Sequence, residues 1–268
     1  MAERATLDRH DPRAVRQAIR EGRFRDFTNH VAPDYVQGNL MIVPAHAADA
    51  FEAYCRANAQ ALPLLGRSQP GSPCIPSLSE TLDVRTDVGA YTVFRNGDLS
   101  GVTMSIADLW RDDLVTFVLG CSFSFESFLR RNGVRLRHLD EGNVSAMYRT
   151  SIATTPAGPF RGPLIVSMRA LRPDDAIRAT VLSASRPMFH GAPVHIGLPG
   201  LIGIDDLADS YGGHGLTTLR DDELPVFWAC GATAQMAALH AGLDLCITHH
   251  KAHMVLTDRL IEEMANYG

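Results

Sequence analysis

Lysine is almost absent from this sequence: Lys251 is the only one in 268 residues, so arginine carries nearly all of the positive side-chain charge. Long hydrophobic runs are absent as well. No stretch approaches the roughly 18 consecutive apolar residues that a membrane span requires, and the N-terminus lacks the apolar segment of a secretory signal. These absences predict a cytoplasmic protein without a membrane partner.

The cysteines form no recognisable framework. There are five, an odd number, with no C-x-x-C pair, so a fold held by disulfides is not expected. No G-x-G-x-x-G fingerprint, P-loop or G-x-S-x-G elbow occurs, which argues against nucleotide cofactors and the usual serine hydrolases. The formal net charge of -5 supplies no positive field that would attract nucleic acid.

The residues that are present are typical of a folded protein, with 46% hydrophobic and 21% charged side chains. The length permits one large domain that carries an insertion. We expect a discontinuous core domain of residues 1–140 and 191–268, with residues 141–190 inserted as a smaller subdomain.

Local patterns predict the first elements. Asp11 before Pro12 is typical of a helix start and predicts a helix over residues 12–21. An apolar stripe predicts a second helix over residues 47–60. The Pro-, Gly- and Ser-rich residues 62–78 predict a loop. Residues 82–88 and 91–99 alternate, and Asn96-Gly97 suits a tight hairpin, so antiparallel strands are expected there.

A repeated pattern decides the expected fold class. Residues 114–120 form a continuous apolar run, typical of a strand covered on both faces, and a helix is predicted after it. Strand, turn and helix recur over residues 193–208 and 224–242, with a further strand over 245–249. This repetition favours an α/β fold, a mostly parallel sheet with helices on both faces in three layers. Residues 147–186, with a helix starting at Pro173, predict a small two-layer α+β insertion.

Three motifs place reactive side chains at or near strand ends, where α/β proteins bind ligands. Around the first of these strand ends, a thiol, two hydroxyls and a carboxylate surround a helix start, an arrangement suited to anion binding and proton transfer. A structural alternative makes the serines helix caps and the cysteines buried hydrophobic residues. The catalytic candidates are Glu126, His195, Cys121 and Cys230.

The substrate-binding candidates are polar residues near strands and turns. An arginine that points into a cleft can clamp a carboxylate, and Asp87 can orient Arg85 from the same strand face. The alternative is a solvated sheet face with weak ion pairs. The candidates are Asn39, Arg85, Asp87, Ser122, Ser124, Arg149, Thr150, Arg169 and His190.

A histidine cluster follows the last predicted strand. His249 and His253 have the i, i+4 spacing of a helical metal pair but lack the intervening Glu of H-E-x-x-H. Hydrogen-bonded structural histidines are the alternative. No metal or other cofactor is therefore assigned, and a divalent metal stays open with these two residues as its candidate ligands.

Seven motifs resemble one family in the same order along the chain, over about residues 35–258. They are GNLMIVP at 38–44, LDVRTDV at 82–88, WRDDLVTFVLGCSFSFE at 110–126, MYRTSI at 147–152, GPLIVSMR at 162–169, HGAPVHIG at 190–197 and PVFWACG at 225–231. The family is that of the "putative hydro-lyases" related to D-glutamate cyclase. The resemblance implies a lyase that acts on a small carboxylate, with conversion of D-glutamate to 5-oxo-D-proline and water as the expected reaction.

That reaction implies roles for the candidates. Glu126 or His195 would transfer protons, the N–H groups over residues 121–124 would bind the oxyanion, and Arg149 or Arg85 would hold the α-carboxylate. The chain departs from the family pattern T-H-x-P-G-H-M at residues 248–254, where Lys251-Ala252 replaces Pro-Gly. This departure bears on the local turn and on the choice of substrate.

Two other functions remain open at this stage. One is a different carbon–oxygen lyase that dehydrates a hydroxy acid. The other is a non-catalytic binder of an acidic metabolite, in which the cysteines and histidines are structural. A homo-oligomer is also left open.

Overall fold

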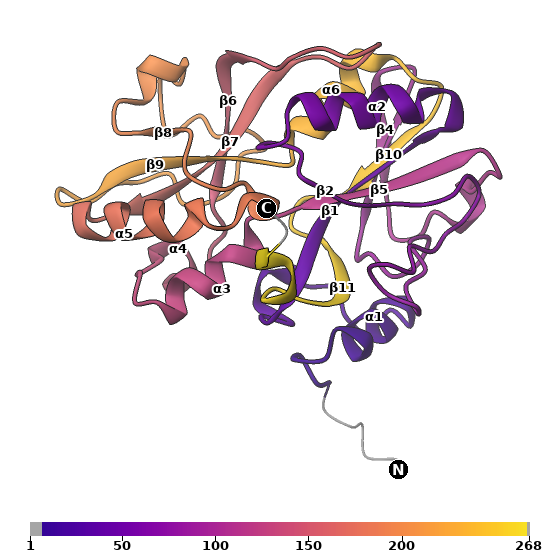
Figure 1. Cartoon of the computed structure of the whole chain (residues 1–268), viewed down its shortest axis with the longest axis horizontal. Coiled ribbons are helices and arrows are strands. Elements are labelled where there is room, and N and C mark those ends of the chain that lie inside the picture. Colours follow the sequence, from indigo (N-terminus) through magenta and orange to yellow (C-terminus); the bar gives the residue numbers. More distant parts are fainter. Residues whose placement is uncertain (1–6, 267–268) are drawn as a thin grey trace.

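The computed structural model describes residues 7–266 and contains two antiparallel sheets that lie side by side (Figure 1). The larger sheet has seven strands, of which β11 (Val255–Leu260) pairs with β1 beside the main path. That path runs in the order β2 (Leu64–Arg67), β5 (Leu114–Gly120), β1 (Tyr35–Pro44), β10 (Cys246–His249), β3 (Tyr91–Arg95) and β4 (Asp98–Thr103).

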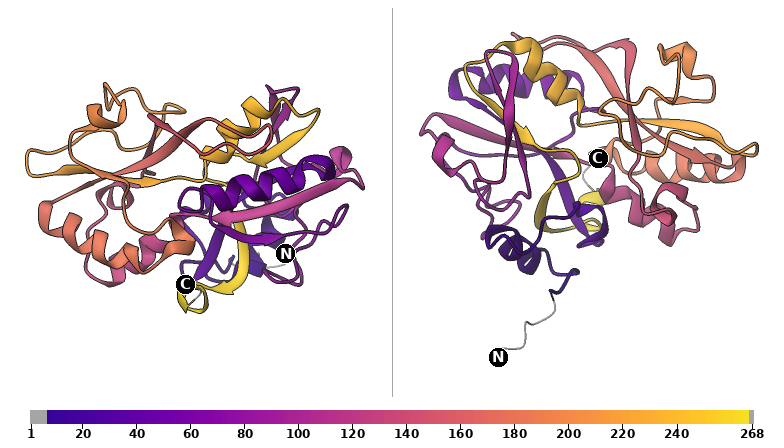
Figure 2. Two further views of the ribbon diagram at one scale, coloured as in Figure 1. Left: turned by 45° about the horizontal axis from the view of Figure 1, so that its top comes forward. Right: turned by 180° about the vertical axis from the view of Figure 1, so that it is seen from behind.

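The smaller sheet has four strands in the order β6 (Ala146–Ala153), β7 (Pro163–Leu171), β9 (Leu224–Ala229) and β8 (His195–Ile196). Figure 2 shows from two further sides that its orange segments stay apart from the indigo and purple strands of the larger sheet. β6 and β7 come from the expected insertion, whereas β8 and β9 follow it in the chain. The proposed division into core domain and insertion stays a prediction.

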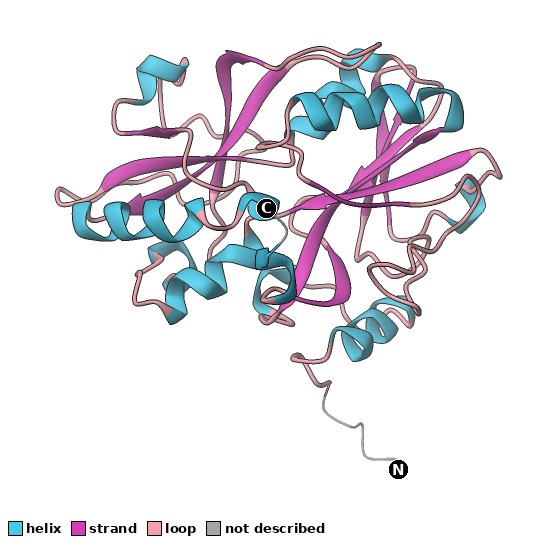
Figure 3. Cartoon of the chain, in the orientation of Figure 1, coloured by secondary structure: helices cyan, strands magenta, loops and turns pink. Residues whose placement is uncertain are grey.

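Helices cover both sheets (Figure 3). α1 (Pro12–Arg20) packs on β11, α2 (Ala45–Ala57) on β1 and β5, and α6 (Thr233–Ala241) on β7. α4 (Arg137–Asp140) packs on β7 and α5 (Pro173–Ala184) on β9 of the smaller sheet, while α3 (Phe123–Arg131) packs against α5 and β1. The short 3-10 turns are η1 (Thr28–His30), η2 (Ala107–Leu109), η3 (Pro187–Phe189), η4 (Pro199–Ile202) and η5 (Glu263–Asn266).

The expected mostly parallel, three-layer α/β fold is wrong, because every strand pair in the two sheets of residues 7–266 is antiparallel. In a parallel sheet each helix returns the chain to a neighbouring strand of the same sheet. Here α3 and α4 carry the chain from β5 to β6 of the smaller sheet, and α6 carries it from β9 back to β10 of the larger one. The strand–turn–helix units that begin at β5 and β9 therefore join the two sheets, whereas the unit over residues 193–208 stays within the smaller sheet.

β5 shows why a continuous apolar run did not mean a parallel strand. All seven of its residues are buried, but only one face is covered by a helix, α2. Val118 on the other face packs against Ile75, Leu78 and other residues of the long segment between β2 and β3. A loop that folds over an antiparallel sheet can thus bury a strand as fully as a second layer of helices.

Among the other local predictions, three elements are confirmed and one strand is wrong. The helix that begins at Pro12, the hairpin at Asn96-Gly97 and the helix that begins at Pro173 are confirmed. The strand predicted over residues 82–88 is wrong, since that segment forms turns. Its carboxylates hold the backbone: Asp83 accepts from the Arg85 N–H at 2.9 Å, and Asp87 accepts from the Asp83 N–H at 3.0 Å.

One hydrophobic cluster joins the two sheets. It contains Met41 and Phe117 of the larger sheet together with Val166 and Phe227 of the smaller one. Leu40 belongs to the cluster on the opposite face of the larger sheet, as the alternation of side chains along β1 requires. The shared cluster packs the two sheets against each other and so positions the side chains at their junction. None of the helices within residues 7–266 has the length and apolar character needed to cross a membrane.

Candidate functional site

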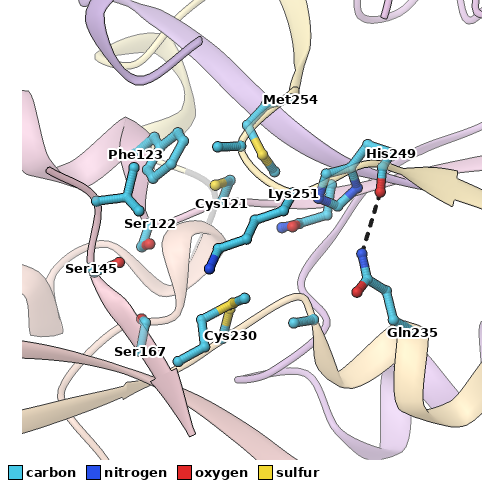
Figure 4. Close-up of a pocket in the computed structure, with 15 residues that line it drawn as sticks. Cys121, Ser122, Phe123, Ser145, Ser167, Cys230, Gln235, His249, Lys251 and Met254 are labelled. Carbon is cyan, nitrogen blue, oxygen red and sulfur yellow. Dashed lines mark hydrogen bonds between the residues drawn. The ribbon is translucent and has the colours of Figure 1, made fainter. Parts of the chain in front are cut away.

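A partly open pocket lies where the two sheets meet (Figure 4). The larger sheet contributes residues at the end of β5, in β1 and after β10, and the smaller sheet contributes residues from β6, β7 and the end of β9. The polar and thiol side chains that line it include Asn39, Cys121, Ser122, Ser145, Ser167, Cys230, Gln235, His249 and Lys251.

Two similar turns bring the cysteines into this pocket. Cys121 follows β5 and precedes α3, and Cys230 follows β9 and precedes α6. The neighbouring backbone N–H groups of Phe123 and Ala232 act to lower the pKa of the Cys121 and Cys230 thiols. Burial nevertheless raises the pKa of both thiols, which are therefore protonated at neutral pH. Each thiol is a proton donor at a helix start.

A buried arginine polarises two hydroxyl groups of the pocket. Arg169 in β7 donates from Nη1 to the Ser167 hydroxyl oxygen at 2.6 Å and from Nη2 to the Ser122 hydroxyl oxygen at 2.8 Å. Because both oxygens accept from the guanidinium, each hydroxyl keeps its own hydrogen for donation. Ser122 and Ser167 can therefore offer two O–H donors to an anionic group in the pocket.

Glu126 holds this arginine in place. Its Oε1 accepts from Arg169 Nε at 3.1 Å and Nη2 at 2.5 Å, and it contacts His138 Nε2 at 3.1 Å. Burial opposes ionisation of Glu126, but the charges of Arg169 and His138 outweigh it and lower its pKa to about 2. Glu126 does not line the pocket. It is a carboxylate at neutral pH that positions Arg169, which differs from the proton-transfer role expected for it.

The loop from His250 to Met254 interrupts the strand that pairs with β1. Met41 pairs with Thr248, and Gly38 pairs with Val255, so three steps along β1 correspond to seven along its partner. The extra residues bulge from the sheet. Ala252 within this loop has a φ of 61°, a left-handed conformation that is strained for alanine.

The bulge places Lys251 in the pocket. Its side chain extends between Cys121 and Cys230 in the view of Figure 4. The Nζ atom is buried and has no hydrogen-bond partner within residues 7–266. Burial lowers the pKa of Lys251, partly offset by the nearby Cys230. The pocket thus contains an amine that loses its proton more readily than an ordinary lysine.

His249 lies beside this loop, with its ring fixed by the backbone. Its Nδ1 accepts from the Leu40 N–H at 3.0 Å, a bond that replaces a strand hydrogen bond where the pairing is interrupted. Burial lowers its pKa to about 4. His249 is therefore neutral at pH 7, and since Nδ1 is the acceptor, Nε2 carries the hydrogen.

Ten of the fifteen sequence candidates do not line the pocket, and four of them make contacts elsewhere in the structure. His195 is on the edge strand β8, where Nε2 contacts the Leu198 carbonyl at 2.8 Å. Arg85 pairs with Asp83 at 2.7 Å. Asp87 pairs with Arg20 of α1 at 2.7 Å. Arg149 lines a separate acidic depression with Asp205, Asp206 and Asp209. The structure does not bring these side chains to the two thiols.

Other candidates make hydrogen bonds that connect elements. Ser124 joins α3 to β1 through both backbone groups of Gln37. Thr150 donates to the Leu164 carbonyl at 2.8 Å, across the β6–β7 pair. His190 is buried, contacts the Gln60 carbonyl at 2.9 Å, and has its pKa lowered by burial to about 4. These contacts are structural.

The two candidate metal ligands do not form a helical pair. His253 stacks on His250 at a ring-centroid distance of 6.1 Å and meets the edge of Phe27 at 5.6 Å, whereas His249 binds the backbone of β1. Within residues 7–266, no group of three or more His, Cys, Asp and Glu side chains is arranged to hold a metal ion. The candidate metal site stays a prediction.

Four polar residues of the pocket were not among the sequence candidates: Ser145, Ser167, Gln235 and Lys251. Ser167 lies within a predicted buried strand and carries no pattern of its own. Lys251 did carry a signal, because it is the only lysine and lies beside the histidine cluster. A rare residue at a departure from a family pattern was a better indicator of the pocket than the arginines near strands.

Comparisons with known proteins give a consistent result. The family model described as D-glutamate cyclase matches residues 115–258. A protein of Verminephrobacter eiseniae named "Putative hydro-lyase" is 52% identical, over 95% of this chain and 92% of its own. Similarly named proteins of Methylobacterium radiotolerans and Bordetella petrii are 51% and 49% identical, over 93% and 94% of this chain and 92% and 95% of theirs. A solved nitrogen repressor-like protein from Methanococcus jannaschii aligns over 90% of this chain and 92% of its own, at 9% identity and a TM-score of 0.40.

Proposed function

The chain belongs to the D-glutamate cyclase family, and on that premise we propose that it is a lyase that closes D-glutamate to 5-oxo-D-proline with release of water. The observation that carries this proposal is the convergence of two thiols, two polarised hydroxyls and one amine on a single pocket. No Asp or Glu is among the residues that line it. A pocket of this kind accepts a small carboxylate without charge repulsion.

The reaction needs both a proton acceptor and a proton donor. The α-ammonium group loses two protons, its nitrogen attacks the γ-carboxyl carbon, and the departing oxygen takes up two protons to leave as water. Lys251 supplies an amine of lowered pKa as the acceptor. The protonated thiols of Cys121, beside the larger sheet, and Cys230, beside the smaller sheet, supply the proton donors. Atoms and charge balance without an oxidant or a further reactant.

The γ-carboxyl group must also be polarised for attack. The hydroxyls of Ser122 and Ser167, each accepting from Arg169, serve as donors to the oxyanion. Glu126 fixes Arg169 and acts only through it. In this proposal the substrate contacts come from β5, β7 and the ends of two helices, and the outlying Arg85, Arg149 and His195 take no part.

The test is an assay of the purified protein with D-glutamate, L-glutamate and both 5-oxoprolines, followed by chiral chromatography. We expect interconversion of the D-forms, and a loss of about 10²- to 10⁴-fold in kcat for Cys121→Ser and Cys230→Ser. Cys74→Ser is the matched control, since Cys74 does not line the pocket. Absence of any conversion by the unmodified protein would contradict the proposal.

The same assay separates the alternatives. Formation of an alkene or enol from a hydroxy acid would identify a different carbon–oxygen lyase. Tight binding of D-glutamate or 5-oxoproline without turnover would identify a binding protein. Either result excludes the cyclase reaction.

A further inference from the structure

Three features of Lys251 point to a role beyond that of proton acceptor in the cyclase reaction. It is the only lysine of a chain that otherwise uses arginine. Its Nζ is buried in the pocket without a hydrogen-bond partner within residues 7–266. Two thiols and two polarised hydroxyls line the same space. These features describe a nucleophilic amine and the proton donors and anion-binding groups that a carbonyl reaction requires.

The surroundings of Nζ favour the neutral amine. No Asp or Glu lines the pocket, so no carboxylate there compensates an ammonium group. A buried ammonium without a partner is unfavourable, and burial accordingly lowers the pKa of this lysine. Arginine would remain protonated at this position under all physiological conditions. A lysine is the residue that can present an unprotonated nitrogen here.

We propose that Lys251 is an imine-forming site for 2-oxo acids. Nζ attacks the keto carbon, the carbonyl oxygen leaves as water after taking up two protons, and a carbon–nitrogen double bond joins lysine to ligand. The two protons come from the amine itself, relayed by the thiols of Cys121 and Cys230. No oxidation or reduction occurs. The step is reversible by addition of water.

The rest of the pocket suits the carboxylate of such an acid. In a 2-oxo acid the carboxylate is bonded directly to the keto carbon, so it must lie within a few ångströms of Nζ. Ser122 and Ser167, polarised by Arg169, offer O–H donors within the same pocket. The inference goes beyond the cyclase reaction, in which the amine only accepts a proton. It does not depend on cyclase turnover.

Reductive trapping tests the proposal directly. The protein is incubated with 2-oxoglutarate or pyruvate and cyanoborohydride, and the adduct is located by intact mass and peptide mapping. Two primary amines of the chain can react, the side chain of Lys251 and the N-terminal amino group. We expect one adduct per chain on the peptide that contains Lys251, and no labelling of that peptide in Lys251→Arg.

Two comparisons make the result decisive. Protein unfolded in urea is labelled under the same conditions, and we expect Lys251 to react more slowly there. If Lys251→Arg does not fold, NMR with [2-¹³C]2-oxoglutarate on the unmodified protein should show an imine carbon signal. Equal labelling of folded and unfolded chains, labelling of the N-terminus alone, or absence of the imine signal would overturn the proposal. Trapping without D-glutamate turnover would reject the cyclase reaction and leave the imine site standing.

Discussion

The Glu126 carboxylate is a buried charge next to the pocket, and its stability depends on its partner Arg169. It is buried, and it accepts hydrogen bonds from the arginine that polarises Ser122 and Ser167. Removing its charge would leave Arg169 buried without a counter-ion. A buried pair broken in this way costs about 3–5 kcal/mol.

Glu126→Gln should therefore lower the free energy of unfolding by about 3–5 kcal/mol at pH 7. The folded pKa of about 2 lies below the ordinary glutamate value of 4.5, so the unfolded chain binds a proton first as the pH falls. The stabilisation is fully present above about pH 4.5 and is lost as the pH approaches 2. Urea unfolding at several pH values should show the gap between the wild type and the variant narrowing across this range. A gap independent of pH, or one equal to that of the exposed Glu80→Gln, would contradict the assignment.

His249 allows a second test at the residue scale. Its folded pKa of about 4 lies below the ordinary 6.5, so the unfolded chain binds a proton first, and stability falls as the pH is lowered from 6.5 to 4. ¹⁵N NMR at pH 5.5 should show a neutral ring protonated on Nε2, because Nδ1 accepts from Leu40. A doubly protonated ring at that pH would be inconsistent with the bond to β1.

At the scale of elements, the two strand–cysteine–helix turns determine the geometry of the pocket. Gly231 in the second turn lies against the amide of Asn39, which donates to the Gly120 carbonyl at 2.6 Å. Asn39 of β1 thus links the turn after β9 to the end of β5. This contact requires a residue without a side chain at position 231.

Gly231→Ala should disrupt that contact, since an added Cβ would lie 2.2 Å from the Asn39 Nδ2 atom. Displacing the amide breaks a buried hydrogen bond, at a cost of about 1–3 kcal/mol. We expect this loss in stability, measured by chemical denaturation, and at least a tenfold loss of turnover. Gly200→Ala is the matched control, because nothing lies within 4 Å of its added Cβ. Equal effects of the two substitutions would show that the turn contact is unimportant.

At the scale of the whole molecule, the pocket depends on two sheets being held together. The cluster that includes Met41, Phe117, Val166 and Phe227 is shared between them. Neither sheet can lose its partner without exposing this apolar surface. Such sharing favours cooperative unfolding of both halves, although sheet membership alone does not define the domains.

The fluorescence of the two tryptophans reports on the two halves of the molecule, the larger sheet and the smaller sheet with their packed helices. Trp110 packs beside the larger sheet and Trp228 lies in β9 of the smaller one. Fluorescence of Trp110→Phe and Trp228→Phe follows each half separately during urea unfolding. In each variant we expect the fluorescence midpoint to coincide with that of far-UV circular dichroism. Separate transitions would indicate that the halves unfold independently and would favour an independently folded insertion.

Local sequence signals determined the elements that depend on neighbouring residues. Asp11-Pro12 begins a helix and Asn96-Gly97 turns a hairpin because both act through backbone conformation within a few residues. The apolar run of β5 correctly predicted a buried strand. The motif order also indicated the family, and two cysteines at strand ends, Cys121 and Cys230, do line one pocket.

Only the tertiary structure decided which strands pair and what the polar side chains contact. Hydrophobic periodicity records how deeply a residue is buried, but it does not identify the element that buries it. The same pattern therefore fitted a parallel sheet as well as two antiparallel ones. Arg85 forms an ion pair with Asp83, whereas Lys251 lies in the pocket because a bulge in the strand opposite β1 directs its side chain there. The positions of these side chains depend on pairing between strands that are far apart in the sequence. A sequence motif contains only residues that are neighbours in the chain.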